Sequence, residues 1–215
     1  MFFSSQILSQ SDIGNNFSIE FSPVYEIEKS NIELNQYQEI NLEMLKFYVG
    51  HISFYYEDKL QWIDSTYHLV NFEDLSQKTI SLSIPNSLEF DQVSVNIGVD
   101  SITNTSGAFE GDLDPINGMY WAWNTGYINL KIEGNIVDKN KDEIGFKFHL
   151  GGYQAPHESV QNISFPITDS EVLSVKIDLP KFLNDIELTE DIVVMSPSKK
   201  AALFSYYFSQ CLISE

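Results

Sequence analysis

The side chains of this chain that best suit a soft or borderline metal ion are those of its histidines and internal methionines. Imidazole nitrogen suits copper and zinc, and thioether sulfur suits copper. A lone histidine on a strand is more often a surface or hydrogen-bonded residue than a ligand, so residue type alone selects no candidate. These residues are His51, His68, His149 and His157, with Met44, Met119 and Met195.

His149 has the most favourable position of the four histidines. Residues 144–151 alternate between apolar and polar types, which predicts a strand with Phe148 and Leu150 inward and His149 outward. Gly151 and Gly152 follow closely, and glycine at a strand end permits the close approach of another backbone. The pattern therefore presents the His149 imidazole on a sheet surface.

A second set of candidate ligands lies in the Asp/Asn/Gly-rich segment 100–118. The carboxylates of Asp100, Asp112 and Asp114 could supply oxygen ligands to calcium. Their spacing does not match an EF-hand loop, and Asx turns explain acidic residues in such a loop just as well. We favour the turns, so these aspartates are expected to order a structural loop.

Two tryptophans, Trp121 and Trp123, follow this segment. Residues two apart on a strand share a face, so the two indoles could form a stacking platform for a sugar. Both could equally pack in the core of a β-sandwich. The sequence leaves these two interpretations open.

Several function classes are disfavoured by motif and charge. The chain lacks the G-x-S-x-G, H-E-x-x-H, phosphate-loop and dinucleotide motifs, which disfavours an enzyme. A net charge of −19 repels nucleic acid, and no segment is long and apolar enough to span a membrane. The single Cys211 excludes an internal disulfide and a multi-thiolate metal site. We expect a monomer.

Short strands separated by turn residues make up most of the chain. Residues 42–56 are apolar on both parities, which predicts a strand buried on both sides or a strand with a bulge at Gly50, while a helix competes for the first half. Residues 199–212 form the one convincing helix, after a cap-like Ser196 that precedes Pro197. The fold class is predicted to be all-β, an antiparallel β-sandwich of immunoglobulin-like or Greek-key type with a C-terminal helix. Further alternating segments lie at 16–21, 79–85, 92–99, 127–133, 164–167 and 173–179.

The domain organisation is expected to be simple. Residues 1–15 are interpreted as an N-terminal tail, either frayed or the end of a signal peptide that begins upstream. Residues 16–215 are interpreted as a single domain, because the length suits one β-rich core.

One long segment of the chain has a distinctive order of motifs, LDPINGMYWAWNTGYINLKIEG, preceded by NIGVDSITNTSGA and followed by FKFHLGGY. These segments resemble those of the MbnP-like family of bacterial copper-binding proteins, in the form found in Bacteroidetes-type genomes. The segments KFYVGHISF, YHLVNF and VMSPSKKA occur at the expected places. The similarity extends from about residue 16 to the C-terminal helix.

The resemblance implies a periplasmic or surface β-sandwich that binds one copper ion through histidine and serves copper acquisition or handling. In relatives, a tryptophan of the copper site is oxidised to kynurenine by a partner di-haem cytochrome peroxidase of the MauG type. Carried over to this chain, the motif tryptophans are Trp121 and Trp123, and the strand-end histidine is His149. His51 is the second imidazole, chosen from its position in a matching segment. WAW departs from copper-binding relatives, which keep a histidine close to the modified tryptophan.

Two other functions stay open at this point. A carbohydrate-binding or adhesion module would use the aromatic residues of the central loop and no metal. A scaffold that has lost its copper site would keep the fold alone.

Overall fold

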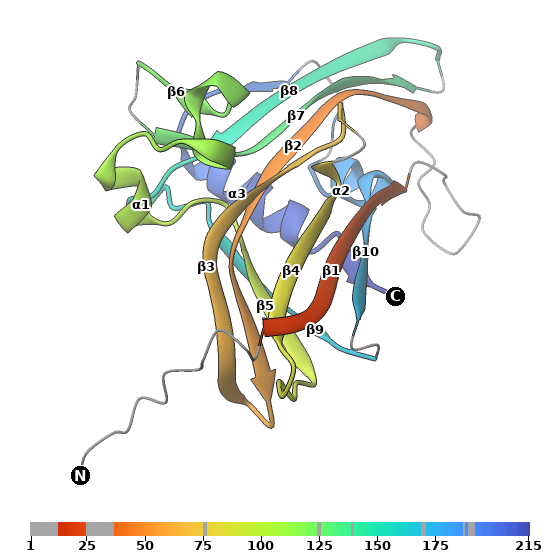
Figure 1. The fold of residues 1–215 in the computed structure, drawn as a ribbon. Coiled ribbons are helices and arrows are strands. Elements are labelled where there is room, and N and C mark those ends of the chain that lie inside the picture. Colours follow the sequence, from red (N-terminus) through yellow and green to blue (C-terminus); the bar gives the residue numbers. More distant parts are fainter. Residues whose placement is uncertain are drawn as a thin grey trace.

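Two β-sheets face each other across one apolar core in the computed structural model (Figure 1). The structure describes residues 13–24, 37–74, 77–123, 126–138, 140–168, 171–186, 188 and 192–215. The strands are β1 (Ile13–Val24), β2 (Tyr37–Tyr56), β3 (Lys59–Asn71), β4 (Thr79–Pro85), β5 (Gln92–Ile97), β6 (Tyr120–Trp121), β7 (Gly126–Asp138), β8 (Glu143–Gly151), β9 (Gln161–Pro166), β10 (Val172–Asp178), β11 (Ile192–Val194) and β12 (Leu212–Ser214). β1 thus begins within the segment expected to be a tail.

Both sheets are mixed, which corrects the prediction of a purely antiparallel sandwich. The smaller sheet has the order β12-β10-β1-β4, and β1 runs parallel to β10. The larger sheet curls into a half-barrel with the order β11-β8-β7-β2-β5-β9, with β3 added along β2, and β11 runs parallel to β8. Alternation predicts which face of a strand is buried, but it carries no information about a partner distant in sequence.

β2 connects the parts of the larger sheet. Its first half pairs with β7, its second half pairs with β5, and β3 follows its other edge. The pairing register shifts between Gly50 and Ile52 against β3 and between Gly50 and Ser53 against β5, and His51 has a φ of 48°. Val49 and Ile52 are both in the main core, so the bulge changes the parity of the strand. The bulge predicted at Gly50 is confirmed.

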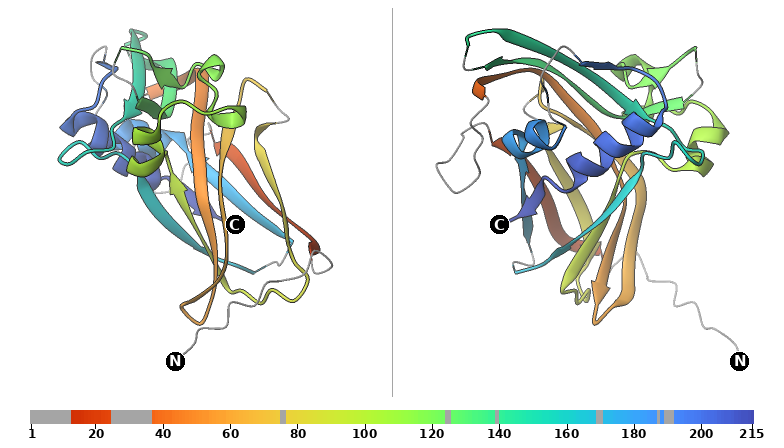
Figure 2. Two further views of the ribbon diagram at one scale, coloured as in Figure 1. Left: turned by 60° about the vertical axis from the view of Figure 1, so that its left-hand side comes forward. Right: turned by 180° about the vertical axis from the view of Figure 1, so that it is seen from behind.

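Among the described residues there are three α-helices where the sequence predicted one: α1 (Ser101–Ser106), α2 (Leu179–Asp185) and α3 (Lys199–Ser209). α3 begins at Lys199 as predicted, but its cap is Ser198 and not Ser196, because the Ser198 hydroxyl accepts the hydrogen bond from Ala201 N. The helix buries Phe204 and Phe208. It ends three residues earlier than predicted, because Leu212–Ser214 pairs with β10 as β12. α2 packs on β1 and α3, while α3 packs on β8 (Figure 2).

Residues 99–121, hereafter the cap, cover the outer face of the larger sheet. The cap contains α1, the 3-10 helices η3 (Gly111–Leu113) and η4 (Pro115–Asn117), and β6. Figure 1 shows it in green beside β3, β7 and β8. A second apolar cluster lies beneath it: Tyr48, Leu69, Val99, Leu113, Met119, Trp121, Tyr127 and Ile128. This cluster fixes the cap to the sheet, because burial of a large apolar side chain contributes about 1.5–3 kcal/mol.

Candidate functional site

His149 lies on the outer face of β8, as predicted from its strand parity. Its neighbours Phe148 and Leu150 belong to the main core on the opposite face. The imidazole Nε2 is 2.6 Å from Glu133 Oε1 of β7, and only 8% of the residue is exposed. Lys147 Nζ lies 2.7 Å from the other carboxylate oxygen, Glu133 Oε2. The Glu133 carboxylate therefore joins the imidazole and a lysine ammonium.

The protonation of this pair follows from its environment. Burial lowers the pKa of His149, and the charge of Lys131 adds to this, although the hydrogen bond to Glu133 opposes both. Burial raises the pKa of Glu133, but hydrogen bonds from Lys147 and His149 outweigh it, so the net direction is downward. A neutral imidazole beside a carboxylate carries its proton on Nε2, which leaves the Nδ1 lone pair as the metal-binding atom.

The Trp121 indole lies on the same outer face as His149. A β-carbon at Gly151 would be 2.8 Å from Trp121 Cζ3, so the indole covers this glycine. Residues 149 and 151 share one face of β8, which places the indole beside the imidazole. Trp121 is 5% exposed, while Trp123 is 68% exposed, with its ring centroid 5.9 Å away. β6 ends at Trp121, so the two indoles do not form a shared strand face.

His51 lies in a different group, between β2, β3 and the cap. Its Nε2 is 2.7 Å from Asp100 Oδ2 and 3.1 Å from the Tyr67 hydroxyl. The Tyr67 hydroxyl donates to the same Asp100 oxygen at 2.5 Å. Burial raises the pKa of Tyr67 to about 12, aided by this bond. Burial raises the pKa of Asp100 too, but hydrogen bonds from Tyr67, Thr103 N and His51 lower it to about 2.

The structure does not bring His149 and His51 together. In the sheet register, His149 is opposite Lys131, and Lys131 is opposite Lys46 of β2. His51 is five positions further along β2, which corresponds to roughly 16 Å at about 3.3 Å per residue. Within the described ranges, no group of three or more His, Cys, Asp or Glu side chains could hold a metal ion.

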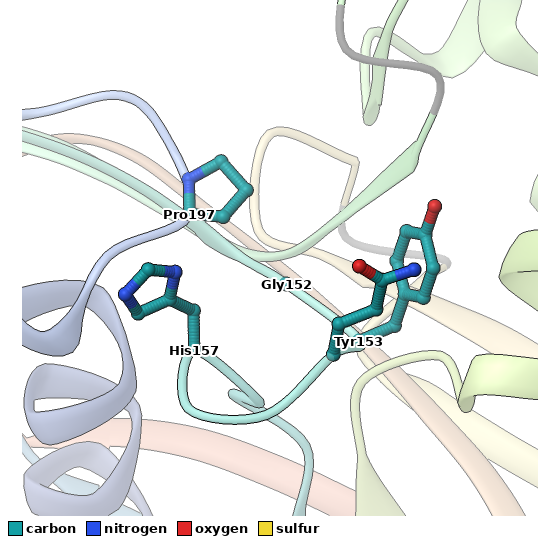
Figure 3. A pocket seen from close by; sticks show the side chains of 5 residues that line it. Gly152, Tyr153, His157 and Pro197 are labelled. Atoms are coloured by element: carbon teal, nitrogen blue, oxygen red, sulfur yellow. The ribbon is translucent and has the colours of Figure 1, made fainter.

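The other two histidines occupy separate places. His68 Nε2 is 2.7 Å from Asp64 Oδ2 on the same strand, β3. His157 lies in the segment between β8 and β9, where it lines a cavity of about 140 Å³ with Gly152, Tyr153, Gln154 and Pro197. Figure 3 shows its ring close to Pro197, away from the Tyr153 ring.

The three loop aspartates each hold a backbone amide. Asp100 Oδ1 accepts a hydrogen bond from Thr103 N at 2.7 Å, and Asp114 Oδ1 accepts one from Ile116 N at 2.9 Å. Asp112 Oδ2 accepts one from Leu69 N at 2.8 Å and so ties the cap to β3. These contacts agree with the interpretation as turns and caps rather than as converging calcium ligands.

Sequence reasoning missed three residues that shape these groups. Glu133 and Tyr67 supply the partners of the two imidazoles. Buried Asn129 joins the cap to the sheet, since its Oδ1 accepts from Val99 N and its Nδ2 donates to Ser159 Oγ. The alternation of residues 127–133 places Glu133 on the polar face of its strand. It does not predict that Glu133 contacts His149, which lies two positions along β8 from the residue opposite Glu133.

The class of protein is defined by these features: a mainly β protein with a nearly buried imidazole beside an indole on the outer face of its larger sheet. The family model MbnP matches residues 14–196. The chain therefore belongs to the MbnP family, whose members are methanobactin-associated, copper-related proteins. No curated protein and no solved structure gives a significant match.

Proposed function

We propose that this protein binds copper at the outer face of β8, with His149 as its imidazole ligand, and serves copper acquisition or handling. The proposal is carried by the environment of His149 within a copper-related family. The imidazole is nearly buried, and a carboxylate orients its Nε2. Metal-binding histidines commonly donate their second ring nitrogen to a carboxylate in this way. In this role copper is the cargo.

The donor set at this face fits copper weakly. His149 supplies one imidazole, and the charge of Glu133 is already shared with Lys147. The ammonium groups of Lys131 and Lys147 lie close enough to lower the pKa of His149, and they repel a cation. One imidazole without thiolates gives modest affinity for copper. The unmodified chain is therefore expected to bind copper weakly.

Modification of a tryptophan would strengthen this donor set. Of the two motif tryptophans, Trp121 lies on the His149 face, so we propose it as the residue oxidised to kynurenine. The conversion cleaves the C2–C3 bond of the indole and releases C2 as formate, which leaves a ketone oxygen and an aromatic amine near His149. The proposed oxidising partner is a di-haem cytochrome peroxidase of the MauG type. Trp123, exposed and in ring contact with Trp121, faces the surface where such a partner would dock.

The proposed location is the periplasm or the outer cell surface. A copper-acquisition protein meets extracellular copper and an oxidising partner in these compartments. None of the helices in the described residues is long and apolar enough to cross a bilayer.

The test is copper content after equilibration of purified protein with limiting copper and removal of excess metal. His149→Ala should lose the bound copper, while His68→Ala, which removes another imidazole–carboxylate pair, should retain it. Copper retention in His149→Ala would refute the assignment. Intact mass of protein purified with and without the cytochrome partner tests Trp121, because kynurenine formation exchanges one carbon for one oxygen atom.

The carbohydrate-binding alternative has weaker support. A sugar-stacking platform requires two indoles on one accessible face. Trp121 is buried, however, and only Trp123 of this pair is exposed. A single exposed indole leaves this function without the stacking platform on which it was based.

A further inference from the structure

We propose that His51, Tyr67 and Asp100 form a second metal site, separate from His149, that binds ferric iron through an imidazole, a phenolate and a carboxylate. Three potential ligand atoms converge there from β2, β3 and the start of the cap. His51 Nε2, the Tyr67 hydroxyl and Asp100 Oδ2 lie 2.5–3.1 Å from one another. No other described histidine contributes to this group.

The spacing of these atoms is close to that of a coordination shell. A small octahedral ion that binds its ligands at about 2.0–2.1 Å holds neighbouring donors about 3 Å apart. The three donors need to move apart by only a few tenths of an ångström to accept such an ion. Their present hydrogen bonds place the same atoms around one point.

The backbone is built to aim these groups at that point. The bulge at residues 50–52 holds His51 in the left-handed region, which costs a non-glycine residue about 1–2 kcal/mol. The Tyr67 ring occupies the space that a side chain at Gly50 would need, so it crosses β2 to reach Asp100. Deviations of this kind occur preferentially at functional positions.

Asp100 is held with one oxygen free for the site. Its Oδ1 accepts the hydrogen bond from Thr103 N that caps α1, which leaves Oδ2 to face His51 and Tyr67. Asp100 N donates to the Tyr67 hydroxyl at 3.2 Å. The phenol and the carboxylate are therefore positioned by the same residue.

The chemistry of the donors selects the ion. Carboxylate and phenolate are hard anionic ligands, and tyrosinate is an established protein ligand of iron, as imidazole is. On binding, the ion takes the place of the Tyr67 hydroxyl proton, which leaves to solvent, and of the His51 Nε2 proton, which moves to Nδ1 through solvent. The net charge of −19 favours the approach of a cation.

The site is open to solvent on one side. The side chains of His51 and Asp100 are 33% and 26% exposed. The third ligand, Tyr67, lines a cavity of about 370 Å³ together with Thr66, Thr103 and Phe109 among others. Water or a small anion could thus fill the remaining coordination positions and exchange there.

The experiment is a titration of the metal-free, full-length protein with ferric nitrilotriacetate. A phenolate bound to ferric iron gives a visible charge-transfer band, which neither copper at His149 nor hexa-aqua iron produces. We expect this band to saturate at one equivalent of iron. Tyr67→Phe should abolish it, and His51→Ala should weaken iron binding by at least about tenfold.

Two matched controls separate this site from the others. His149→Ala should leave the band unchanged, even if it loses copper, and so should His68→Ala, which removes the imidazole–carboxylate pair that has no phenol partner. Absence of the band in the unaltered protein overturns the proposal, whether or not the variants fold. A band that persists in folded Tyr67→Phe, checked by circular dichroism, overturns it as well.

Discussion

His149 and His51 are both paired through Nε2 with a carboxylate, at 2.6 and 2.7 Å, yet the two pairs differ in every other respect. The third partner is the Lys147 ammonium in one case and the Tyr67 phenol in the other. A carboxylate that also binds an ammonium mainly orients its histidine, whereas a carboxylate beside a phenol is available as a ligand itself. The chemical role of an imidazole–carboxylate pair therefore depends on the third group that contacts the carboxylate.

The backbones beneath the two pairs differ as well. His149 lies in a regular strand, while His51 sits at a bulge with a φ of 48°. Burial differs in parallel, because the His149 side chain is 10% exposed and that of His51 is 33% exposed. The position of a buried imidazole on a regular strand depends on packing, and that of a partly buried imidazole at a bulge depends on its hydrogen bonds.

The largest expected effect comes from filling the glycine beside each pair. A β-carbon at Gly151 would lie 2.5 Å from the Tyr127 carbonyl oxygen and also meet Trp121, whereas one at Gly50 meets the Tyr67 ring. Backbone cannot move as readily as a side chain, so Gly151→Ala should cost about 3 kcal/mol and Gly50→Ala about 1–2 kcal/mol. Denaturant unfolding of the two variants measures this difference. Equal losses would show that the two glycines are under the same constraint.

Removal of each imidazole should separate the pairs next. His149→Ala leaves the poorly exposed Glu133 with Lys147 alone and should cost about 2 kcal/mol. His51→Gly should remain within about 1 kcal/mol of the parent, because relief of the left-handed strain offsets the lost hydrogen bonds. His51→Ala, which keeps the strain, is the matched control and should be less stable than His51→Gly. The reverse order would contradict the role of the bulge.

Acid unfolding tests the carboxylates. Asp100 has a folded pKa of about 2, below its ordinary value of 3.8, so its contribution is present above that value and is lost as the pH falls from about 4 to 2. After allowance for solvent screening, this amounts to about 1 kcal/mol. Stability of Asp100→Asn should therefore fall less steeply across this window than that of the parent. Identical pH dependence of stability in Asp100→Asn and the parent would show that Asp100 makes no such contribution. The pKa of Glu133 is also lowered, so Glu133→Gln should change the profile in the same direction.

The smallest effect is expected at the third imidazole–carboxylate pair. His68 and Asp64 lie on one strand, four residues apart, and both are part-buried. An ion pair near the surface contributes about 0–1 kcal/mol, so His68→Ala should change unfolding free energy by less than about 1 kcal/mol. It should also leave both metal titrations unchanged. A loss of copper or iron in this variant would mean that the two larger pairs are not distinct sites.

Local sequence patterns predicted several features of the secondary structure of this protein. Alternation along 144–151 was enough to put His149 outward, and the two parities of 42–56 indicated either a strand buried on both sides or the bulge at Gly50 that the structure has. Helical spacing predicted the start of α3 at Lys199, although its cap is Ser198 and not the predicted Ser196. Each of these depends on residues within a few positions of one another, and the period of a strand or helix is legible at that range.

Pairing between distant strands was decided only by the tertiary structure. Nothing local in the sequence distinguishes the parallel pairing of β1 with β10 from an antiparallel one, which is why the purely antiparallel prediction failed. The same reason hid the partners of the candidate ligands: Asp100 is 49 positions from His51, and Glu133 is 16 from His149. Trp121 and Trp123 are near neighbours in sequence, yet only the folded cap buries one and exposes the other. A period-two pattern specifies which face of a strand a side chain occupies. The residues that this face contacts are distant in sequence, so they are determined only when the chain between them folds back.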